Sequence, residues 1–218
     1  LNPALLPALN HDDIKLIDEA AAKSELSSFG VPVPKKIKAA SAEQAATFAD
    51  TLGYPLVLKG LGIAHKTEMG AVKLNLKSAH DVFEAAQNMA GDGFLIEQFI
   101  DEVIVELLVG VVVDPAHGYV LTVGAGGTLT EILKDSQSLI LPVTENDIEQ
   151  VLSALKVSPI IDGYRGKPAA NKKAIINAIM GAASYVKAHH GQVEEVEINP
   201  LLCREHDAFA ADVLLRRS

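Results

Sequence analysis

The chain has 218 residues, of which 49% are hydrophobic and 22% charged, and its net charge at pH 7 is −9. This length supports a sizeable core, as one large domain or two smaller lobes. A negative charge without a basic cluster argues against a nucleic-acid surface, no apolar run is long enough to span a membrane, and the single cysteine, Cys203, suits a reducing compartment. We therefore expect a cytoplasmic protein.

The first ninety or so residues predict helices and strands in alternation. Residues 1–11 contain two prolines and no sustained hydrophobic period, which indicates a linker or arm. Asp12 or Asp13 is the expected N-cap of the first helix, and Ser41 begins a capping box at the second. Helices are thus expected over residues 12–30, 41–53 and 78–90, and strands near residue 37 and over residues 55–59 and 71–76.

The rest of the chain predicts antiparallel strands followed by helices. The short turn at residues 114–118 joins two apolar runs, which favours a hairpin over a crossover. Thr144 and Asn171 are candidate N-caps for helices that reach Leu155 and about His189. Strands are expected over residues 93–97, 103–113, 119–123, 196–201 and 211–214. The fold class is therefore α+β, with two α/β lobes over residues 12–92 and 93–218 and a cleft between them.

Three polar residues stand in the apolar strands near the end of the chain. Glu197, Asn199 and Asp212 offer two carboxylates and one amide oxygen among Val, Ile and Leu. Buried carboxylates need a cation or a hydrogen-bond donor, and oxygen ligands favour Mg²⁺. The alternative is that two edge strands simply turn these acids toward water.

A lysine and a glycine-containing loop follow the strand at residues 55–59. Lys59 ends an apolar run, where its ammonium group must reach water or an anion. The loop over residues 60–70 contains three glycines together with His65, Lys66 and Thr67, a composition that suits phosphate binding. The loop lacks the Gly-Lys-Ser/Thr of a P-loop, and a plain surface loop is the alternative.

Further candidates lie in the middle of the chain. The glycines of residues 124–127 do not complete a dinucleotide-binding fingerprint, so we expect a tight bend or a close backbone approach there. Glu131, Lys134 and Asp135 follow as ligand contacts or as a solvated face. Glu97 and Glu106 each stand in an apolar strand, where an acid either faces water or binds a hydroxyl, an amino group or a metal.

In combination, these motifs resemble the ATP-grasp domain of the NDP-forming acyl-CoA synthetases, the family of ADP-forming acetyl-CoA synthetase and, more distantly, succinyl-CoA synthetase. The resemblance runs in order from about residue 13 to the end. Its most specific segments are residues 65–70, 106–115, 124–127 with 131–135, 164–166 and 197–201.

The resemblance implies a role for each matching residue. His65 matches a histidine that relays a phosphoryl group, and Glu197 matches an acid near the docking site of a phosphorylated histidine. Asn199 and Asp212 match the Mg²⁺ ligands. The residues that match the ATP- or ADP-binding site are Lys59, Lys66, Thr67, Gly70, Glu97, Glu106, Gly126 and Gly127.

The function implied is that of a nucleotide-binding and phosphoryl-transfer module of an ADP-forming acyl-CoA synthetase that works through phosphohistidine, with Mg²⁺ as cofactor. Its implied partners are a CoA-binding domain and a phosphohistidine-bearing domain, which are not in this sequence, and the full-length enzyme is expected to be an oligomer without nucleic-acid or membrane partners. Two alternatives stay open. One is a regulatory nucleotide-sensing domain fused to a protein acetyltransferase, and the other is a scaffold without catalysis.

Overall fold

The computed structural model describes residue 9 and residues 13–62, 70–127 and 134–218. Two compact units make up the chain: Pro34–Asp101 form the smaller, and Leu1–Val33 with Glu102–Ser218 form the larger. Each unit has its own hydrophobic core. Among the described residues, none of the helices has the length and apolar character that crossing a bilayer requires.

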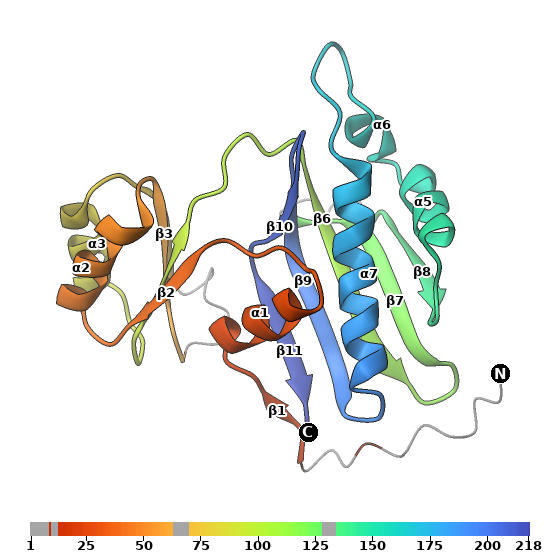
Figure 1. Ribbon diagram of the computed structural model, residues 1–218, viewed down its shortest axis with the longest axis horizontal. Coiled ribbons are helices and arrows are strands. Elements are labelled where there is room, and N and C mark those ends of the chain that lie inside the picture. Colours follow the sequence, from red (N-terminus) through yellow and green to blue (C-terminus); the bar gives the residue numbers. More distant parts are fainter. Residues whose placement is uncertain (1–8, 10–12, 63–69, 128–133) are drawn as a thin grey trace. The chain divides into compact units, whose positions relative to one another are not determined.

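The smaller unit is an antiparallel sheet of four strands with two helices (Figure 1). The side chain of Ser41 accepts a hydrogen bond from the Gln44 N–H at 3.3 Å, which confirms the expected N-cap of α2. The helices pack on the core through small residues such as Ala45 and Ala49. In sheet order the strands are β2 (Lys36–Ala39), β5 (Phe94–Gln98), β3 (Leu56–Gly60) and β4 (Val72–Leu76), and the helices are α2 (Ala42–Leu52) and α3 (Ala79–Gln87).

The unit boundaries differ from the expected lobe boundary between residues 92 and 93. Strand β5 lies beyond that point, yet it pairs with both β2 and β3 and so belongs to the smaller unit. The first residues of the chain, in turn, belong to the larger unit. The reason is strand pairing over a long sequence separation, in which Lys15 and Leu16 pair with Arg217 and Arg216.

The larger unit is built on a seven-stranded sheet whose pairings are all antiparallel, which confirms the expected hairpins (Figure 1). Figure 1 shows α1, α5 and α7 on one face of this sheet. In sheet order the strands are β1 (Lys15–Leu16), β11 (Val213–Arg217), β9 (Val193–Cys203), β6 (Val105–Asp114), β7 (Gly118–Ala125) and β8 (Ser136–Ile140), with β10 (Ala208–Ala210) paired to β9; the helices are α1 (Glu19–Ser28), α5 (Glu145–Ala154), α6 (Ser158–Ile161) and α7 (Lys172–Ala188).

Helix α1 begins later than the sequence pattern indicated. We expected Asp12 or Asp13 as its N-cap, but the N-cap is Asp18, whose carboxylate accepts a hydrogen bond from the Ala21 N–H at 3.3 Å. The preceding segment is an edge strand, and the N–H of Ile17 still donates to Leu215 at 2.9 Å. The expectation was wrong because this segment pairs as a strand with residues 200 and 202 positions away in the chain.

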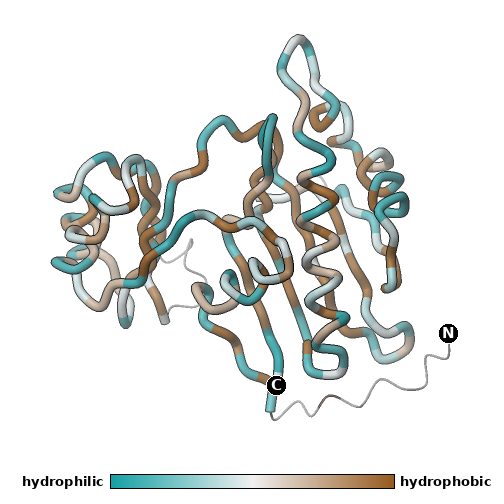
Figure 2. The backbone as a smooth tube through the Cα atoms, in the orientation of Figure 1, coloured by the Kyte–Doolittle hydropathy of each residue, from teal (hydrophilic) through white to brown (hydrophobic). Residues whose placement is uncertain are grey.

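Alternation along β6 separates the two faces of the large sheet. Leu107, Val109 and Val111 are buried in the core beneath the helices, whereas Gly110 and Val112 lie on the opposite face. Figure 2 shows the hydrophobic colouring along the central strands and α7, with hydrophilic colouring in the turns. We call the face opposite α1, α5 and α7 the second sheet face.

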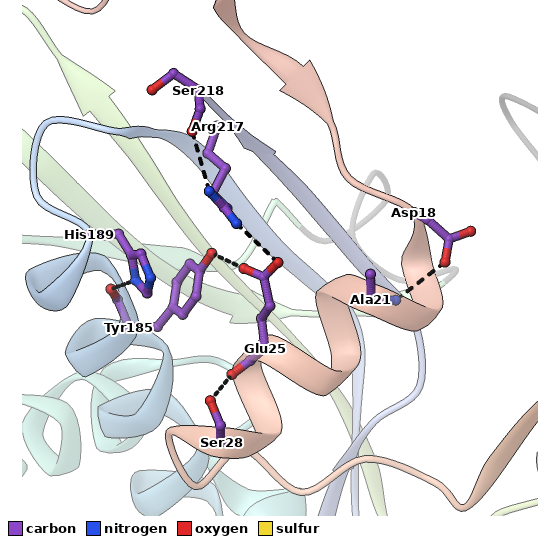
Figure 3. Close-up of polar contacts among 8 residues, drawn as sticks. All are labelled: Asp18, Ala21, Glu25, Ser28, Tyr185, His189, Arg217 and Ser218. Carbon is purple, nitrogen blue, oxygen red and sulfur yellow. Dashed lines mark hydrogen bonds and ion pairs between the residues drawn. The ribbon is translucent and has the colours of Figure 1, made fainter.

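A polar cluster fastens the last strand to the helices (Figure 3). The Tyr185 hydroxyl donates to Glu25 at 2.6 Å, and Arg217 donates to the other oxygen of that carboxylate at 3.2 Å. Partial burial alone would raise the pKa of Glu25, but these two bonds lower it overall. Burial, followed by the bond to Glu25, raises the pKa of Tyr185. Helices α1 and α7 and strand β11 are thus tied together, with His189 stacked on Tyr185 at 4.3 Å between ring centroids.

Candidate functional site

A β-bulge lies in the middle of β9, at Asn199–Pro200. From Ile198 to Leu201 this strand advances three residues, while the paired strand β6 advances two, between Val109 and Leu107. The extra residue lets Ile198 and Leu201 both reach the core, although they are three positions apart. Bulges are frequent beside functional sites because they redirect a side chain. Here the bulge presents Asn199.

Asn199, Gly127 and Glu106 meet at one end of the sheet. The Asn199 side-chain oxygen accepts a hydrogen bond from the Gly127 N–H at 3.0 Å. Gly127 has a φ of 60°, and a Cβ there would clash with the Glu106 carboxylate. Only glycine suits both demands, the left-handed backbone and the close carboxylate. The predicted residues Glu106, Gly127 and Asn199 are therefore brought together.

Asp212 lies next to Asn199, although not within a strand as expected. Asp212 lies in the short connection between β10 and β11, and the Asn199 N–H donates to the Asp212 carbonyl at 3.2 Å. One Asp212 carboxylate oxygen accepts the Val213 N–H at 3.0 Å. Because Asp212 lies between two strands, the alternation of side chains between the two sheet faces does not fix the direction of its side chain.

Gly126 supports this arrangement by a close backbone approach. Its N–H donates to the Glu106 carbonyl at 2.9 Å, and a Cβ on it would overlap the backbone of Leu107. This confirms the expected close approach at residues 124–127. The glycine turn is thereby held against β6, beside the carboxylate of Glu106.

Asp135 is the residue of this region that sequence reasoning did not resolve. The sequence allows either a ligand contact or a solvated residue, but Asp135 is only 6% exposed. Its two carboxylate oxygens accept the N–H groups of Lys156 and Val157 at 2.8 and 3.0 Å, and its carbonyl accepts the N–H of Ala125 at 2.9 Å. Asp135 thus ties the strand before the glycine turn to the turn between α5 and α6. Sequence gives no signal for these bonds, because they join segments 21 and 22 residues apart.

Glu197 lies on the second sheet face, half-buried, two residues before Asn199. It is directly opposite Gly110 on β6 and Leu214 on β11. Glu195 lies on the same face of the strand. Partial burial and then repulsion from Glu197 raise the pKa of Glu195, while Arg216 opposes the shift. The region is therefore acidic, and a positive or N–H-bearing group would stabilise it.

In the smaller unit, Lys59 and Glu97 form a buried ion pair. The Lys59 Nζ lies 3.1 Å from a Glu97 carboxylate oxygen, with 7% and 2% of the two side chains exposed. They come from the neighbouring strands β3 and β5. The carboxylate beside this lysine offsets part of the cost of burying an ammonium group. The pairing places both residues predicted to bind nucleotide on one sheet.

The oxygen atoms of Asn199 and Asp212 suit a hard cation such as Mg²⁺. The Asn199 oxygen has two lone pairs, of which the bond from Gly127 uses one, and the Asp212 carboxylate has several acceptor positions. Within the described ranges, no cluster of three or more His, Cys, Asp or Glu residues could hold a metal. One carboxylate and one amide would leave the other positions to water and nucleotide phosphates, as is usual for Mg²⁺.

Four further residues predicted for the site are not placed beside Asn199 by the structure. His65, Lys66 and Thr67 lie outside the described residues. Gly70 is described, with a φ of 67° in an exposed turn and nothing within 4 Å of an added Cβ. Its backbone therefore needs glycine for conformation and not for space.

The sequence profile of the ATP-grasp domain family matches residues 8–216. The chain belongs to this family. Among its relatives, the beta subunit of acetate–CoA ligase [ADP-forming] I from Pyrococcus furiosus is 32% identical over 206 residues, which cover 89% of this chain and 88% of that one. Trans-feruloyl-CoA synthase FCS1 from an unknown prokaryotic organism is 34% identical, but this chain spans only 30% of its length.

Solved structures give the same result. The dinucleotide forming acetyl-coenzyme A synthetase 1 of Candidatus Korarchaeum cryptofilum, in complex with coenzyme A and Ca-AMPCP, matches with a TM-score of 0.86 at 28% identity, covering 94% of each chain. Another structure of that protein contains coenzyme A and Mg-AMPPCP, with its phosphohistidine segment pointing towards the nucleotide binding site; its TM-score is 0.83. The chain is thus an ATP-grasp domain of the kind found in ADP-forming acyl-CoA ligases.

Proposed function

We propose that this chain binds Mg²⁺ with ATP or ADP and exchanges the terminal phosphoryl group with a histidine, as one domain of an ADP-forming acyl-CoA synthetase. The observation that carries the proposal is the meeting of Glu106, Gly127 and Asn199 beside Asp212. Side-chain oxygens can bind a metal ion, and the backbone N–H groups of an adjacent glycine turn can bind phosphates.

The chemistry follows from what phosphoryl transfer requires. In the direction of ATP use, the bond between the γ-phosphorus and the bridging oxygen breaks, a P–N bond forms to an imidazole nitrogen, and ADP leaves. Enzymes promote this step chiefly by positioning and by neutralising charge. When bound, Mg²⁺ would supply charge neutralisation on the phosphate oxygens. Asn199 and Asp212 would hold it, and Lys59 would add an ammonium group.

The histidine relay and the partners belong to the same proposal. His65 is the proposed relay within this chain, with Lys66, Thr67 and Gly70 as phosphate contacts, and Glu197 is the proposed acid beside an incoming histidine. Neutral imidazole is a good nucleophile near pH 7, so it suits a relay between separate sites. The CoA-binding and phosphohistidine-bearing domains are proposed as its partners, in an oligomeric and cytoplasmic enzyme.

Membership of the family does not identify which carboxylic acid the full enzyme converts to its CoA thioester. The names of the relatives include acetate, 4-hydroxybutyrate, succinate and feruloyl compounds, at identities of 25 to 34%. Overall, the proposed reaction converts acyl-CoA, ADP and phosphate into a carboxylic acid, CoA and ATP, and is reversible.

The test is calorimetric titration of the chain with ADP, with and without Mg²⁺. We expect binding that depends on Mg²⁺ and that weakens at least tenfold in Asp212→Asn. Glu149→Gln removes one exposed carboxylate from α5 and serves as the matched control, with no expected change. Binding that is equally strong in Asp212→Asn would contradict the assigned metal site. Tight binding without ATP–ADP phosphoryl exchange in the assembled enzyme would favour a nucleotide-sensing domain instead.

A further inference from the structure

Helix α1 contains a lysine whose side chain has no access to solvent. The Lys23 side chain is 0% exposed, and its Nζ lies 2.9 Å from a carboxylate oxygen of Glu19, which is 3% exposed. Lysine and glutamate are rarely buried, because removing their charges from water is costly even when the two are paired. Well-packed apolar side chains at such positions often give equal or greater stability. The stability of the fold therefore does not explain this pair.

The ammonium group of Lys23 also contacts the connection between β10 and β11. Its Nζ donates a hydrogen bond to the carbonyl oxygen of Ala211 at 2.7 Å, across 188 positions of the sequence. This carbonyl belongs to the planar peptide unit that joins Ala211 to Asp212. The hydrogen bond thus restrains the plane from which the backbone of Asp212 continues.

The same connection is bonded to the bulge in β9. The Ala211 N–H donates to the Pro200 carbonyl at 3.0 Å, and the Asp212 carbonyl accepts the Asn199 N–H at 3.2 Å. Asp212 lies outside both β10 and β11, so these bonds take the place of regular strand pairing. Helix α1 and strand β9 therefore both hold the short segment that carries the Asp212 side chain.

We infer that Lys23 is a positioning residue for the metal site. It holds the peptide before Asp212 so that the Asp212 carboxylate and the Asn199 side-chain oxygen stay in reach of one Mg²⁺ ion. Glu19 holds the ammonium group in place, and neither of the two residues touches the metal. This inference rests on the proposed function, because it concerns the ligands of the proposed Mg²⁺. Such an ion demands near-ideal octahedral geometry, so a displaced ligand weakens its binding.

The test compares variants of the chain in which the buried ion pair is altered. Lys23→Met removes the bond to Ala211, but it also leaves the Glu19 carboxylate without this cation and should destabilise the fold. Glu19→Leu/Lys23→Met removes both charges and should retain the urea midpoint of the unaltered chain. The double variant decides the matter if the single variant does not fold. Glu25→Leu is the matched control, since it removes a polar contact of the same helix with β11, at Arg217 (Figure 3).

Two quantities are measured in each variant. Amide hydrogen exchange at Asn199 and Ala211, without metal or nucleotide, reports on the connection. The Mg²⁺ concentration that half-saturates ADP binding reports on the metal site. In the double variant we expect exchange at both amides to become at least tenfold faster, and the half-saturating Mg²⁺ concentration to rise at least fivefold. Glu25→Leu should leave both quantities within twofold of the unaltered chain.

Values within twofold of the unaltered chain in a folded double variant would overturn the inference. Faster exchange with an unchanged Mg²⁺ requirement would also overturn it, because Lys23 would then serve the fold alone. So would equal changes in Glu25→Leu, since any loosening of α1 would then have the same effect. Absence of Mg²⁺-dependent ADP binding in the unaltered chain would overturn the proposed function, and this inference with it.

Discussion

Lys59 and Glu97 illustrate how a pair of opposite charges is accommodated in a buried position. Lysine is rarely buried, and its charge persists at this depth only with a partner. The carboxylate 3.1 Å away provides one. If the ammonium group also contacts a nucleotide phosphate, as proposed, then the same pair holds it at the end of a strand before any ligand arrives. Such positioning reduces the reorganisation that binding would otherwise require.

The pair makes a prediction about stability that is independent of nucleotide. Lys59→Met leaves the Glu97 charge without this cation, so we expect the free energy of unfolding to fall by about 3 kcal/mol at pH 7. The double variant Lys59→Met/Glu97→Leu removes both charges and should recover most of that loss. Urea unfolding measures both. Lys73→Met, at an exposed position of the neighbouring strand β4, is the control, expected to stay within about 0.5 kcal/mol. A double variant as unstable as the single one would show that the ion pair is not the cause.

At the scale of elements, Asp135 joins segments that the sheet alone would leave separate. Its carboxylate holds the turn between α5 and α6, and its carbonyl holds the end of β7. Asp135→Ala removes the acceptor of the buried Val157 N–H and of the partly buried Lys156 N–H. We therefore expect a loss of about 2 kcal/mol in the free energy of unfolding, measured by chemical denaturation.

The control for this prediction is Asp114→Ala. Asp114 also accepts two backbone N–H groups, those of Ala116 and His117 at 2.8 Å, but 40% of its side chain is exposed, so water can replace it. We expect a loss below about 1 kcal/mol there. Equal losses in the two variants would mean that burial does not set the contribution of Asp135.

Local sequence signals predicted many elements but not those fixed by distant partners. Ser41, Thr144 and Asn171 are the N-caps of their helices, as their side-chain chemistry indicated. The strand at Lys15–Leu16 was missed because only its pairing with β11 makes it a strand. The same holds for the candidate site. The side-chain chemistry of Asn199 and Asp212 indicates both residues. The connection between β10 and β11 that contains Asp212, however, depends on the pairing of both strands with β9.

At the scale of the whole molecule, the two separate hydrophobic cores imply two regions that can unfold independently. Ile96 is fully buried in the core of the smaller unit, and Ile198 is fully buried in that of the larger. Truncating a buried isoleucine to alanine removes about 2–5 kcal/mol. Because the cores are separate, we expect Ile96→Ala to speed amide hydrogen exchange in β2, β3 and β5 and to leave β6 and β9 protected.

Mass spectrometry of exchanged peptides measures this, and Ile198→Ala should give the reverse pattern. Faster exchange throughout the chain in either variant would mean that the two cores unfold together.

The bulge at Asn199–Pro200 has a consequence for how this gene can change. Its extra residue keeps the buried side chains of β9 in phase with the core on both of its sides. Deleting codon 199 or 200 would leave Ile198 and Leu201 two positions apart and still facing the core, but it would remove the bulge that presents Asn199. Deleting codon 202 would instead make Leu201 and Cys203 neighbours and turn one of them out of the core, whereas a codon added in the exposed turn at 115–117 would disturb only that turn. A library of single-codon deletions, scored for soluble expression and for Mg·ADP binding, should therefore lose binding but keep expression at codons 199 and 200, and lose expression at codon 202.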